Sequence, residues 1–361
     1  MRIVVNDIAA TPGAGGVYSI LSDLYNQVKK SDKDNEWIFI LAGKYFQETD
    51  NIKIIERPDL KKNKLKKFIF ELFNGYKFIN SYRPDIYISL QNIATLKVKA
   101  SKQIVYLHQP IPFQRQKNFS FLKISEIKLA FYQHIVGRII KHSISKVQPY
   151  TIVQTKWMRE AVSQKTKLSK NKLIVEHPFV NVGSSKEIHV KKKCNSFFYP
   201  ASGYLYKNHA LIYKAIDILN CNGINNFNVS FTLDNLKKHN QKNIRFLGHI
   251  KRDKVFSMYE DSVLIFPSYI ESFGLPLVEA ALKADIILAA DTEFSHELLG
   301  NYDNVYFYSY DDPKKLAELM LKVIKGGIVS DGIPLAIKDN GQSLLTTIKN
   351  IIGKGWGSVY E

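Results

Sequence analysis

Two glutamates, Glu271 and Glu279, are separated by seven residues in the segment FPSYIESFGLPLVEA, which spans residues 266–280. The apolar run before them, from Ser262 to Phe266, predicts a buried strand. Gly274 favours a tight turn, and Pro276 suits the first turn of a helix. We therefore expect Glu271 in the loop after the strand and Glu279 about one turn into the helix. Free backbone N–H groups at the helix start can bind phosphate, and the carboxylates can accept hydrogen bonds from sugar hydroxyls. The spacing suits a sugar nucleotide.

The same residues also allow a plainer interpretation, in which Glu271 is a solvated loop residue and Glu279 an exposed helix residue that interacts with the dipole. The complete string, however, resembles the E-x7-E signature of retaining glycosyltransferases of family 4, the glycosyl transferases group 1. This resemblance implies a GT-B α/β fold, with two doubly wound Rossmann-like domains facing each other across a cleft. It also implies that Glu279 holds the donor ribose, that Glu271 faces the donor sugar, and that the backbone of Phe273, Gly274 and Leu275 contacts sugar and phosphate.

A glycine-rich loop, TPGAGGV at residues 11–17, follows the first expected strand. Glycines let the backbone approach a ligand closely. A dinucleotide fingerprint would need a third glycine where Tyr18 stands, so that motif is incomplete. The family resemblance places Gly15 and Gly16 near the donor phosphates and the acceptor, whereas the alternative is a plain tight turn.

His108 follows the expected strand Gln103–Leu107 directly. A lone histidine is more often a hydrogen-bonded structural residue than a catalytic one. In open parallel sheets, however, ligands bind beyond the carboxyl ends of strands. The family has a histidine at this point that contacts the donor sugar, and retaining transfer needs no general base on the opposite face. We therefore assign His108 to the catalytic site as a sugar-positioning residue.

Lys207 follows the turn after the expected strand Phe197–Tyr199 and can balance the charge of a diphosphate. This segment resembles the donor-phosphate motif of the family, in which an arginine lies six positions before the lysine. Here Ala201 occupies that position, which leaves Lys207 as the cation of the loop, and Ser202 or a residue elsewhere is expected to compensate. The alternative is a solvated lysine. Gly248, His249 and Ile250 resemble the turn beside the nucleobase.

The order of expected strands and helices is typical of doubly wound sheets. A polar tract, Asn181–Asn195, is expected to link two halves. We predict a first domain at residues 1–180 and a donor domain at 181–340. The family resemblance implies a final helix at 341–361 that crosses back to the first domain. The expected helices of the first half are Gly16–Lys29 and Leu65–Asn80, and the expected strands are Arg2–Val5, Trp37–Leu41, Asp85–Leu90, Gln103–Leu107, Tyr150–Gln154, Phe197–Tyr199, Asn228–Leu233, Ile244–Phe246, Val263–Phe266 and Ile286–Ala290.

Positive charge is concentrated in residues 51–200, which carry 29 Lys/Arg and 8 Asp/Glu, a surplus of +21 against +18 for the whole chain. Lysines and apolar residues mix in segment 61–70, and Phe119–Val147 alternates basic and apolar residues at helical spacing. Such stretches suit an anionic membrane surface. Nucleic acid is not expected as a partner, because no nucleic-acid motif accompanies the charge. The alternative is a lysine-rich surface that reflects a biased genome composition.

Several sequence features indicate a cytoplasmic enzyme. No stretch reaches about 18 consecutive apolar residues, and the start MRIVVND becomes polar too soon for a secretory signal. The cysteines Cys194 and Cys221 have no metal or redox spacing. No acidic metal-binding motif lies in the expected cleft loops, so neither a metal nor a cofactor is expected.

The sequence therefore predicts a membrane-associated retaining glycosyltransferase at the inner face of the plasma membrane. We expect a nucleotide-diphosphate sugar as donor and a hexose-like sugar as the transferred group. The expected acceptor is lipid-linked or a saccharide, and a saccharide on a polyprenyl diphosphate is the expected partner. A bacterial O-antigen, capsule or related surface polysaccharide pathway is the expected setting. The alternatives are another GT-B enzyme, such as a nucleotide-sugar epimerase or a phosphorylase, and a non-catalytic basic protein that binds membrane or nucleic acid.

Overall fold

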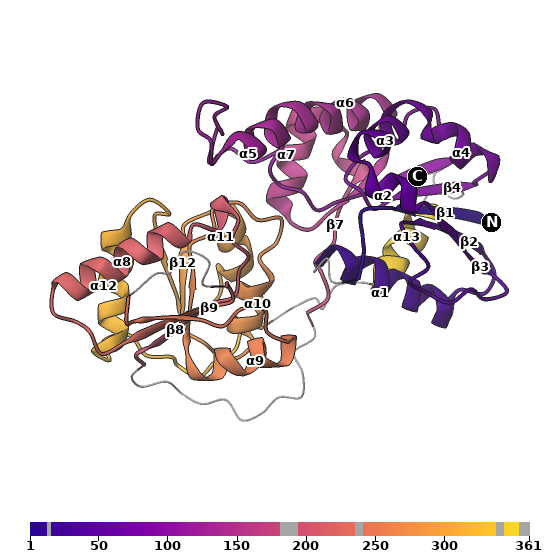
Figure 1. Cartoon of the computed structure of the whole chain (residues 1–361). Helices are drawn as coiled ribbons and strands as arrows, with labels where there is room; N and C mark the ends of the chain where they lie inside the picture. The colour runs from indigo at the N-terminus through magenta and orange to yellow at the C-terminus, as the bar shows by residue number, and fades with distance from the viewer. Residues whose placement is uncertain (13–15, 181–193, 235–240, 337–342, 354–361) are drawn as a thin grey trace. The chain divides into compact units, whose positions relative to one another are not determined.

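The computed structural model describes residues 1–12, 16–180, 194–234, 241–336 and 343–353, and it divides into two compact units (Figure 1). Unit 1 comprises residues 1–122, 127–179 and 341–361, and unit 2 comprises residues 123–126 and 180–340. Each unit is built on one parallel β-sheet with helices packed against it. Most of the predicted linker, Asn181–Asn195, lies outside the described residues.

Unit 1 has a seven-stranded parallel sheet in the order β3-β2-β1-β4-β5-β6-β7. The prediction that Tyr150–Gln154 is the last strand of the first domain is wrong, because a further strand, β7, pairs with β6. It also missed β3, a five-residue strand in which charged residues interrupt the apolar pattern. The strands are β1 (Arg2–Asp7), β2 (Glu36–Leu41), β3 (Ile52–Glu56), β4 (Ile86–Ser89), β5 (Lys102–Leu107), β6 (Tyr150–Val153) and β7 (Leu173–Val175).

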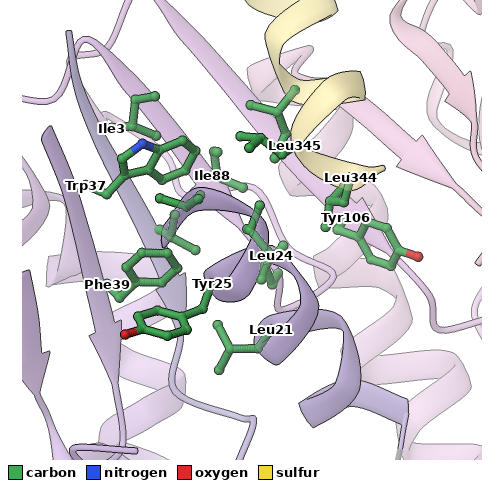
Figure 2. Close-up of a cluster of buried hydrophobic side chains, with 14 of the residues drawn as sticks. Ile3, Leu21, Leu24, Tyr25, Trp37, Phe39, Ile88, Tyr106, Leu344 and Leu345 are labelled. Atoms are coloured by element: carbon green, nitrogen blue, oxygen red, sulfur yellow. The ribbon is translucent and has the colours of Figure 1, made fainter. Parts of the chain in front are cut away.

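Both faces of this sheet are buried. Successive side chains of a strand point to opposite faces, and each set packs into its own apolar cluster. Ile3 and Val5 of β1 join a cluster with helices α1 (Gly16–Ser31) and α13 (Leu344–Gly353). Figure 2 shows Leu344 and Leu345 of α13 in this cluster. Val4 points the other way, into a cluster with α2 (Pro58–Lys62) and the helices that follow it. Apolar burial on both sides explains the near-continuous hydrophobic runs of the strands.

Helix α13 is fixed to unit 1 by more than apolar contacts. The Lys102 ammonium donates hydrogen bonds to the carbonyl oxygens of Ile351 and Ile352, both at 2.8 Å. A cation at this end of a helix satisfies carbonyls that lack an intrahelical partner and interacts favourably with the dipole. Ile348 and Ile351 are buried in the same cluster as β1. The final described segment is thus part of the core of unit 1.

The predicted helix Leu65–Asn80 is not one regular α-helix. It consists of α3 (Lys64–Ile69), a π-helical turn η1 (Phe70–Asn74) and α4 (Gly75–Ser81). The turn ends at Gly75, whose N–H donates to the Phe70 carbonyl. A Cβ at residue 75 would lie only 2.4 Å from that oxygen, so glycine permits the close approach.

The basic segment Phe119–Val147 is helical only from Ile127, and it also contains a π-helical turn. The turn η2 (Tyr132–Val136) again ends at a glycine, Gly137. The helices of this part of unit 1 are α5 (Ile127–Phe131), α6 (Gly137–Val147), α7 (Lys156–Thr166) and the 3-10 turn η3 (Lys170–Lys172).

Unit 2 has a six-stranded parallel sheet in the order β10-β9-β8-β11-β12-β13. The predicted strands are present with ends within two residues, but the outermost strand β13 (Val305–Tyr308) was missed. Helices α8 (His209–Cys221) and α12 (Pro313–Ile324) pack against each other (Figure 1). The other elements are β8 (Ser196–Tyr199), η4 (Leu205–Lys207), β9 (Asn228–Phe231), β10 (Ile244–Phe246), α9 (Arg252–Asp261), β11 (Val263–Phe266), α10 (Leu275–Ala281), β12 (Ile287–Ala290) and α11 (Glu293–Leu299).

No helix among the described residues is both long enough and apolar enough to cross a membrane.

Candidate functional site

The two loops that carry Lys207 and Glu271 meet at the switch point of the unit 2 sheet. Strand β8 lies between β9 and β11, so the connections leaving β8 and β11 run to opposite sides of the sheet. A crevice beyond the carboxyl ends of two such strands is the usual ligand site of an open α/β sheet. Lys207 ends the turn η4 after β8, and Glu271 lies five residues beyond the end of β11. The topology therefore brings both residues to the carboxyl ends of β8 and β11, at the switch point of the sheet.

Lys207 and Glu271 form an ion pair, in which the Lys207 ammonium donates to Oε1 of Glu271. Their side chains are only 18% and 13% exposed, so water screens the pair less than it screens a surface pair. The two loops are also joined through their backbones, because the N–H of Tyr269 donates to the carbonyl of Tyr206 at 3.2 Å. The interpretation of Lys207 as a solvated lysine is therefore wrong.

Asn208, which the sequence analysis did not select, holds the Lys207 loop in place. Its φ of +60° is in the left-handed region, which asparagine tolerates better than most residues. Its side-chain amide donates to the carbonyl oxygens of Tyr310 at 2.7 Å and Pro267 at 3.3 Å. The Tyr199 hydroxyl donates to the Lys207 carbonyl at 2.8 Å. The lysine is thus presented by a loop fixed at several points.

Gly274 provides the turn between the Glu271 loop and helix α10. Its φ is +102°, a conformation that L residues rarely adopt, and Pro276 lies in the first turn of the helix, as predicted. Leu275 begins the helix and is partly exposed. Phe273 is buried in a small cluster with Val180 and Val278.

Glu279 is buried, with 6% of the residue exposed, so the interpretation of an exposed helix residue is wrong. Its Oε1 accepts a hydrogen bond from the Arg252 guanidinium at 2.9 Å, and its Oε2 accepts one from the Tyr259 hydroxyl at 3.1 Å. Burial raises the pKa of this carboxyl, while Arg252 and Tyr259 act in the opposite direction. Neither partner was selected from the sequence, because both lie on α9, away from the recognised string.

The remaining candidates of unit 2 lie on exposed turns. Gly248 has a φ of +64°, and a Cβ there would lie 3.0 Å from Oδ1 of Asp234. His249 is exposed and Ile250 is partly exposed. Ser202 is exposed in the loop after β8, and the structure gives it no partner that would fix it as the replacement for an arginine at Ala201.

His108 and Gly16 belong to unit 1. Asn92, in the loop after β4, accepts hydrogen bonds from the backbone N–H groups of His108 and Gln109 at 2.7 and 3.0 Å. The Asn92 amide lies 3.2 Å from Nε2 of His108 and can donate to it, which places the imidazole proton on Nδ1. Desolvation lowers the pKa of His108 to about 4. Gly16 is the first residue of α1, and Gly15 lies outside the described residues.

A comparison with protein-family models gives one match, which lies within unit 2. Residues 184–331 match the family model described as Glycosyl transferases group 1. This part of the chain therefore resembles a glycosyl transferases group 1 domain. It contains Lys207, Glu271 and Glu279, whereas His108 and Gly16 lie outside it. A comparison with curated proteins gave no match.

Several solved structures resemble the chain over almost its whole length. WaaG, a glycosyltransferase involved in lipopolysaccharide biosynthesis, is 12% identical, with 90% of each chain covered and a TM-score of 0.65. A glycosyltransferase from Rickettsia africae is 14% identical, with 91% of this chain and 92% of that chain covered and a TM-score of 0.58. HepE from Anabaena, solved with UDP-glucose, is 13% identical, with 91% and 90% covered and a TM-score of 0.57. The predicted GT-B fold class is confirmed.

Outside the group 1 domain, the structure shows a buried carboxyl that the sequence analysis passed over. Asp7 ends β1, beside β4 at the switch point of the unit 1 sheet, and is 0% exposed. Its Oδ1 accepts from the Ala10 N–H at 3.2 Å, and its Oδ2 has no hydrogen-bond partner among the described residues. Burial raises the pKa of Asp7 to about 7, opposed by Lys67 and Lys61.

The stability of unit 1 should therefore fall as the pH rises from about 4 to about 7. The folded state holds the Asp7 proton more tightly than the unfolded state, so the contribution is present at low pH and is lost as pH rises through the folded pKa. We expect Asp7→Asn to stabilise the protein at pH 8 by about 2–4 kcal/mol relative to its effect at pH 4. Urea unfolding at both pH values measures this difference. Asp34→Asn, at an exposed position, is the control and should show no such dependence.

Proposed function

We propose that the chain is a retaining glycosyltransferase of family 4 that moves a hexose-like sugar from a nucleotide-diphosphate sugar to a lipid-linked or saccharide acceptor. The observation that carries this proposal is the Lys207–Glu271 pair at the sheet switch point, inside the group 1 domain and on the same segment as the buried Glu279. HepE, which shares the fold, was solved with UDP-glucose, and this supports a nucleotide sugar as the donor.

In this proposal, the diphosphate of the donor takes the place of Glu271 as the anion beside Lys207. A phosphate oxygen accepts a strong, charge-assisted hydrogen bond from an ammonium. The Glu271 carboxylate then accepts hydrogen bonds from the sugar hydroxyls, and backbone N–H groups near Gly274 contact the phosphate. The Ala201 position supplies no second cation, so Lys207 takes most of the charge that develops on the leaving group.

Transfer breaks the bond between the anomeric carbon and the phosphate oxygen, through a transition state with oxocarbenium character. The acceptor hydroxyl attacks the same face, and its proton passes to the departing diphosphate. Retention needs no separate base, which agrees with a His108 imidazole that burial keeps neutral at physiological pH. We assign His108 to positioning of the sugar rather than to proton abstraction. The proposed reaction uses no metal and no cofactor.

The proposal also includes the acceptor and the location of the enzyme. We assign the acceptor to a saccharide on a polyprenyl diphosphate, used in bacterial O-antigen, capsule or related surface polysaccharide synthesis. WaaG, which has the same fold, is involved in lipopolysaccharide biosynthesis. The +21 surplus of residues 51–200 supports a peripheral position on the anionic, cytoplasmic face of the plasma membrane.

Thermal unfolding in the presence of nucleotide diphosphates and nucleotide sugars tests the donor site. A ligand that binds only the native state stabilises it by about 2.7 kcal/mol at 100 times its dissociation constant. We expect one nucleotide series to raise the melting temperature, and Glu279→Ala to reduce the shift strongly. Glu318→Ala on α12 removes an exposed glutamate of the same unit and should leave the shift unchanged. No shift with any nucleotide in excess would contradict the transferase proposal.

A further inference from the structure

Unit 1 has an apolar groove that the proposed reaction does not use. It lies where η1 and α4 approach α6, and it encloses a cavity of about 510 Å³. Apolar side chains from all three elements line it. They are those of Leu72 and Phe73 in η1, Tyr76 in α4 and Ile139 in α6. Its volume is in the range of roughly 300–1,000 Å³ that is usual for sites of small molecules. The groove is therefore large enough for an apolar ligand.

The edge of this groove is basic. Lys97, Arg138 and His142 contribute to its lining, and all three residues are exposed. No acidic residue lines it, and α6 contains no aspartate or glutamate. The neighbouring Glu71 lies near Lys67, with 3.6 Å between their charged atoms. Within the described part of the chain, the Arg138 guanidinium has no ion pair with a carboxylate. The groove is thus matched to an anion as well as to an apolar chain.

A π-helical turn contributes to one wall of the groove, and the helix of the other wall begins directly after the second turn. Phe73 lies in η1 and is 67% exposed, although phenylalanine is usually buried. Gly75 and Gly137 end the two turns next to the lining residues, and each is constrained by the carbonyl five residues earlier. Such turns are frequent at functional sites. The exposed ring beside three basic residues has the composition of a surface that enters the boundary between lipid head groups and acyl chains.

We propose that this groove binds one acyl chain of an anionic phospholipid in a bilayer, with Arg138, His142 and Lys97 around its phosphate. The observations favour a lipid over a soluble peptide, because the apolar walls and the unopposed positive charge match the two halves of an amphiphile. The inference rests on the membrane association proposed above, and it is independent of glycosyl transfer.

A tryptophan placed at the groove reports on the lipid directly. Phe73→Trp is mixed with phosphatidylglycerol vesicles whose acyl chains are brominated, because bromine quenches an indole that it touches. We expect strong quenching of this tryptophan and a blue shift of its emission. Both are measured against the parent protein, in which Trp37 and Trp157 are buried and Trp356 lies outside the described residues. Ile333→Trp, at an exposed apolar position of unit 2, is the matched control and should not be quenched.

Three further variants test whether vesicle binding depends on the groove rather than on general surface charge. Arg138→Gln should lower partitioning onto phosphatidylglycerol vesicles about fivefold, whereas Lys30→Gln, in the last turn of α1, should change it much less. Ile139→Trp fills the groove with all charges retained and should also weaken partitioning. The same vesicles made of phosphatidylcholine should bind weakly.

Three results would overturn the proposal. They are vesicle binding without quenching of the tryptophan at position 73, equal losses for Arg138→Gln and Lys30→Gln, and no effect of filling the groove. Preferential binding of a polyprenyl phosphate over phosphatidylglycerol would also overturn it, since the occupant would then be the acceptor. The nucleotide shift is measured on the same variants without lipid. Its retention in protein that fails to bind vesicles would reject this inference while leaving the transferase proposal in place.

Discussion

Glu271→Gln is expected to lower turnover at saturating donor by roughly 10²- to 10³-fold while the protein remains folded. Groups that stabilise developing charge in a water-poor site typically contribute this much. Glutamine keeps the size of the side chain but loses the negative charge that pairs with Lys207 and that would stabilise an oxocarbenium-like sugar. Transfer of radiolabelled sugar measures the rate, and the melting temperature without ligand verifies the fold.

The matched control for this variant is Glu260→Gln. Glu260 also pairs with a lysine of unit 2, Lys283, at 3.2 Å, and belongs to α9 rather than to the loops of the switch point. The Glu260→Gln variant should therefore lose little activity. Lys207→Met should be as damaging as Glu271→Gln, and the double variant should lose far less than the product of the two losses, because residues that act as a unit are not additive. Full activity of Glu271→Gln would refute the role assigned to Glu271.

Glu279→Ala is expected to weaken nucleotide binding by roughly 10- to 100-fold, since a hydrogen bond to a charged group contributes about 1.5–3 kcal/mol. The carboxylate that we assign to the ribose is held by Arg252 and Tyr259, at 2.9 and 3.1 Å. Tyr259→Phe removes one of these hydrogen bonds and should have a smaller effect, of about fivefold. Calorimetric titration with the nucleotide found in the thermal panel measures both.

The ribose assignment has its own control. A nucleotide that lacks the 2′-hydroxyl should bind the parent protein more weakly, and Glu279→Ala should no longer distinguish it from the complete nucleotide. Equal discrimination by the parent and by the variant would show that Glu279 acts only as a structural partner of Arg252. The buried carboxyl would then stabilise the packing of α9 against α10 without contacting the ligand.

The strands of both sheets could be predicted where they are apolar along their whole length. Val263–Phe266 and Trp37–Leu41 are examples, because a strand buried on both faces has no polar positions to obscure it. Strands β3, β7 and β13 were missed since they are short and partly exposed at the sheet edges. The π-helical turns could not be predicted from helical periodicity, which assumes 3.6 residues in each turn.

The sequence predicted several of the residues of the candidate site, but it did not predict which of them contact each other. The spacing of Glu271 and Glu279 placed one on a loop and one on a helix, and the structure has them there. The pairing of Glu271 with Lys207, 64 residues earlier, depends on β8 and β11 being neighbours, which the sequence order of the strands does not reveal. Arg252 and Tyr259 were missed for the same reason. Their helix packs against α10 only in the folded unit.

The position of α13 has a consequence for how the protein is made. Its residues Leu344, Leu345 and Ile348 fill the core of unit 1, yet they are translated after the whole of unit 2. When residue 340 has been added, every residue of unit 2 has been synthesised, while the core of unit 1 still lacks one of its helices. Most of unit 2 is therefore an insertion in the chain of unit 1, and the core of unit 1 cannot be complete until α13 has been synthesised.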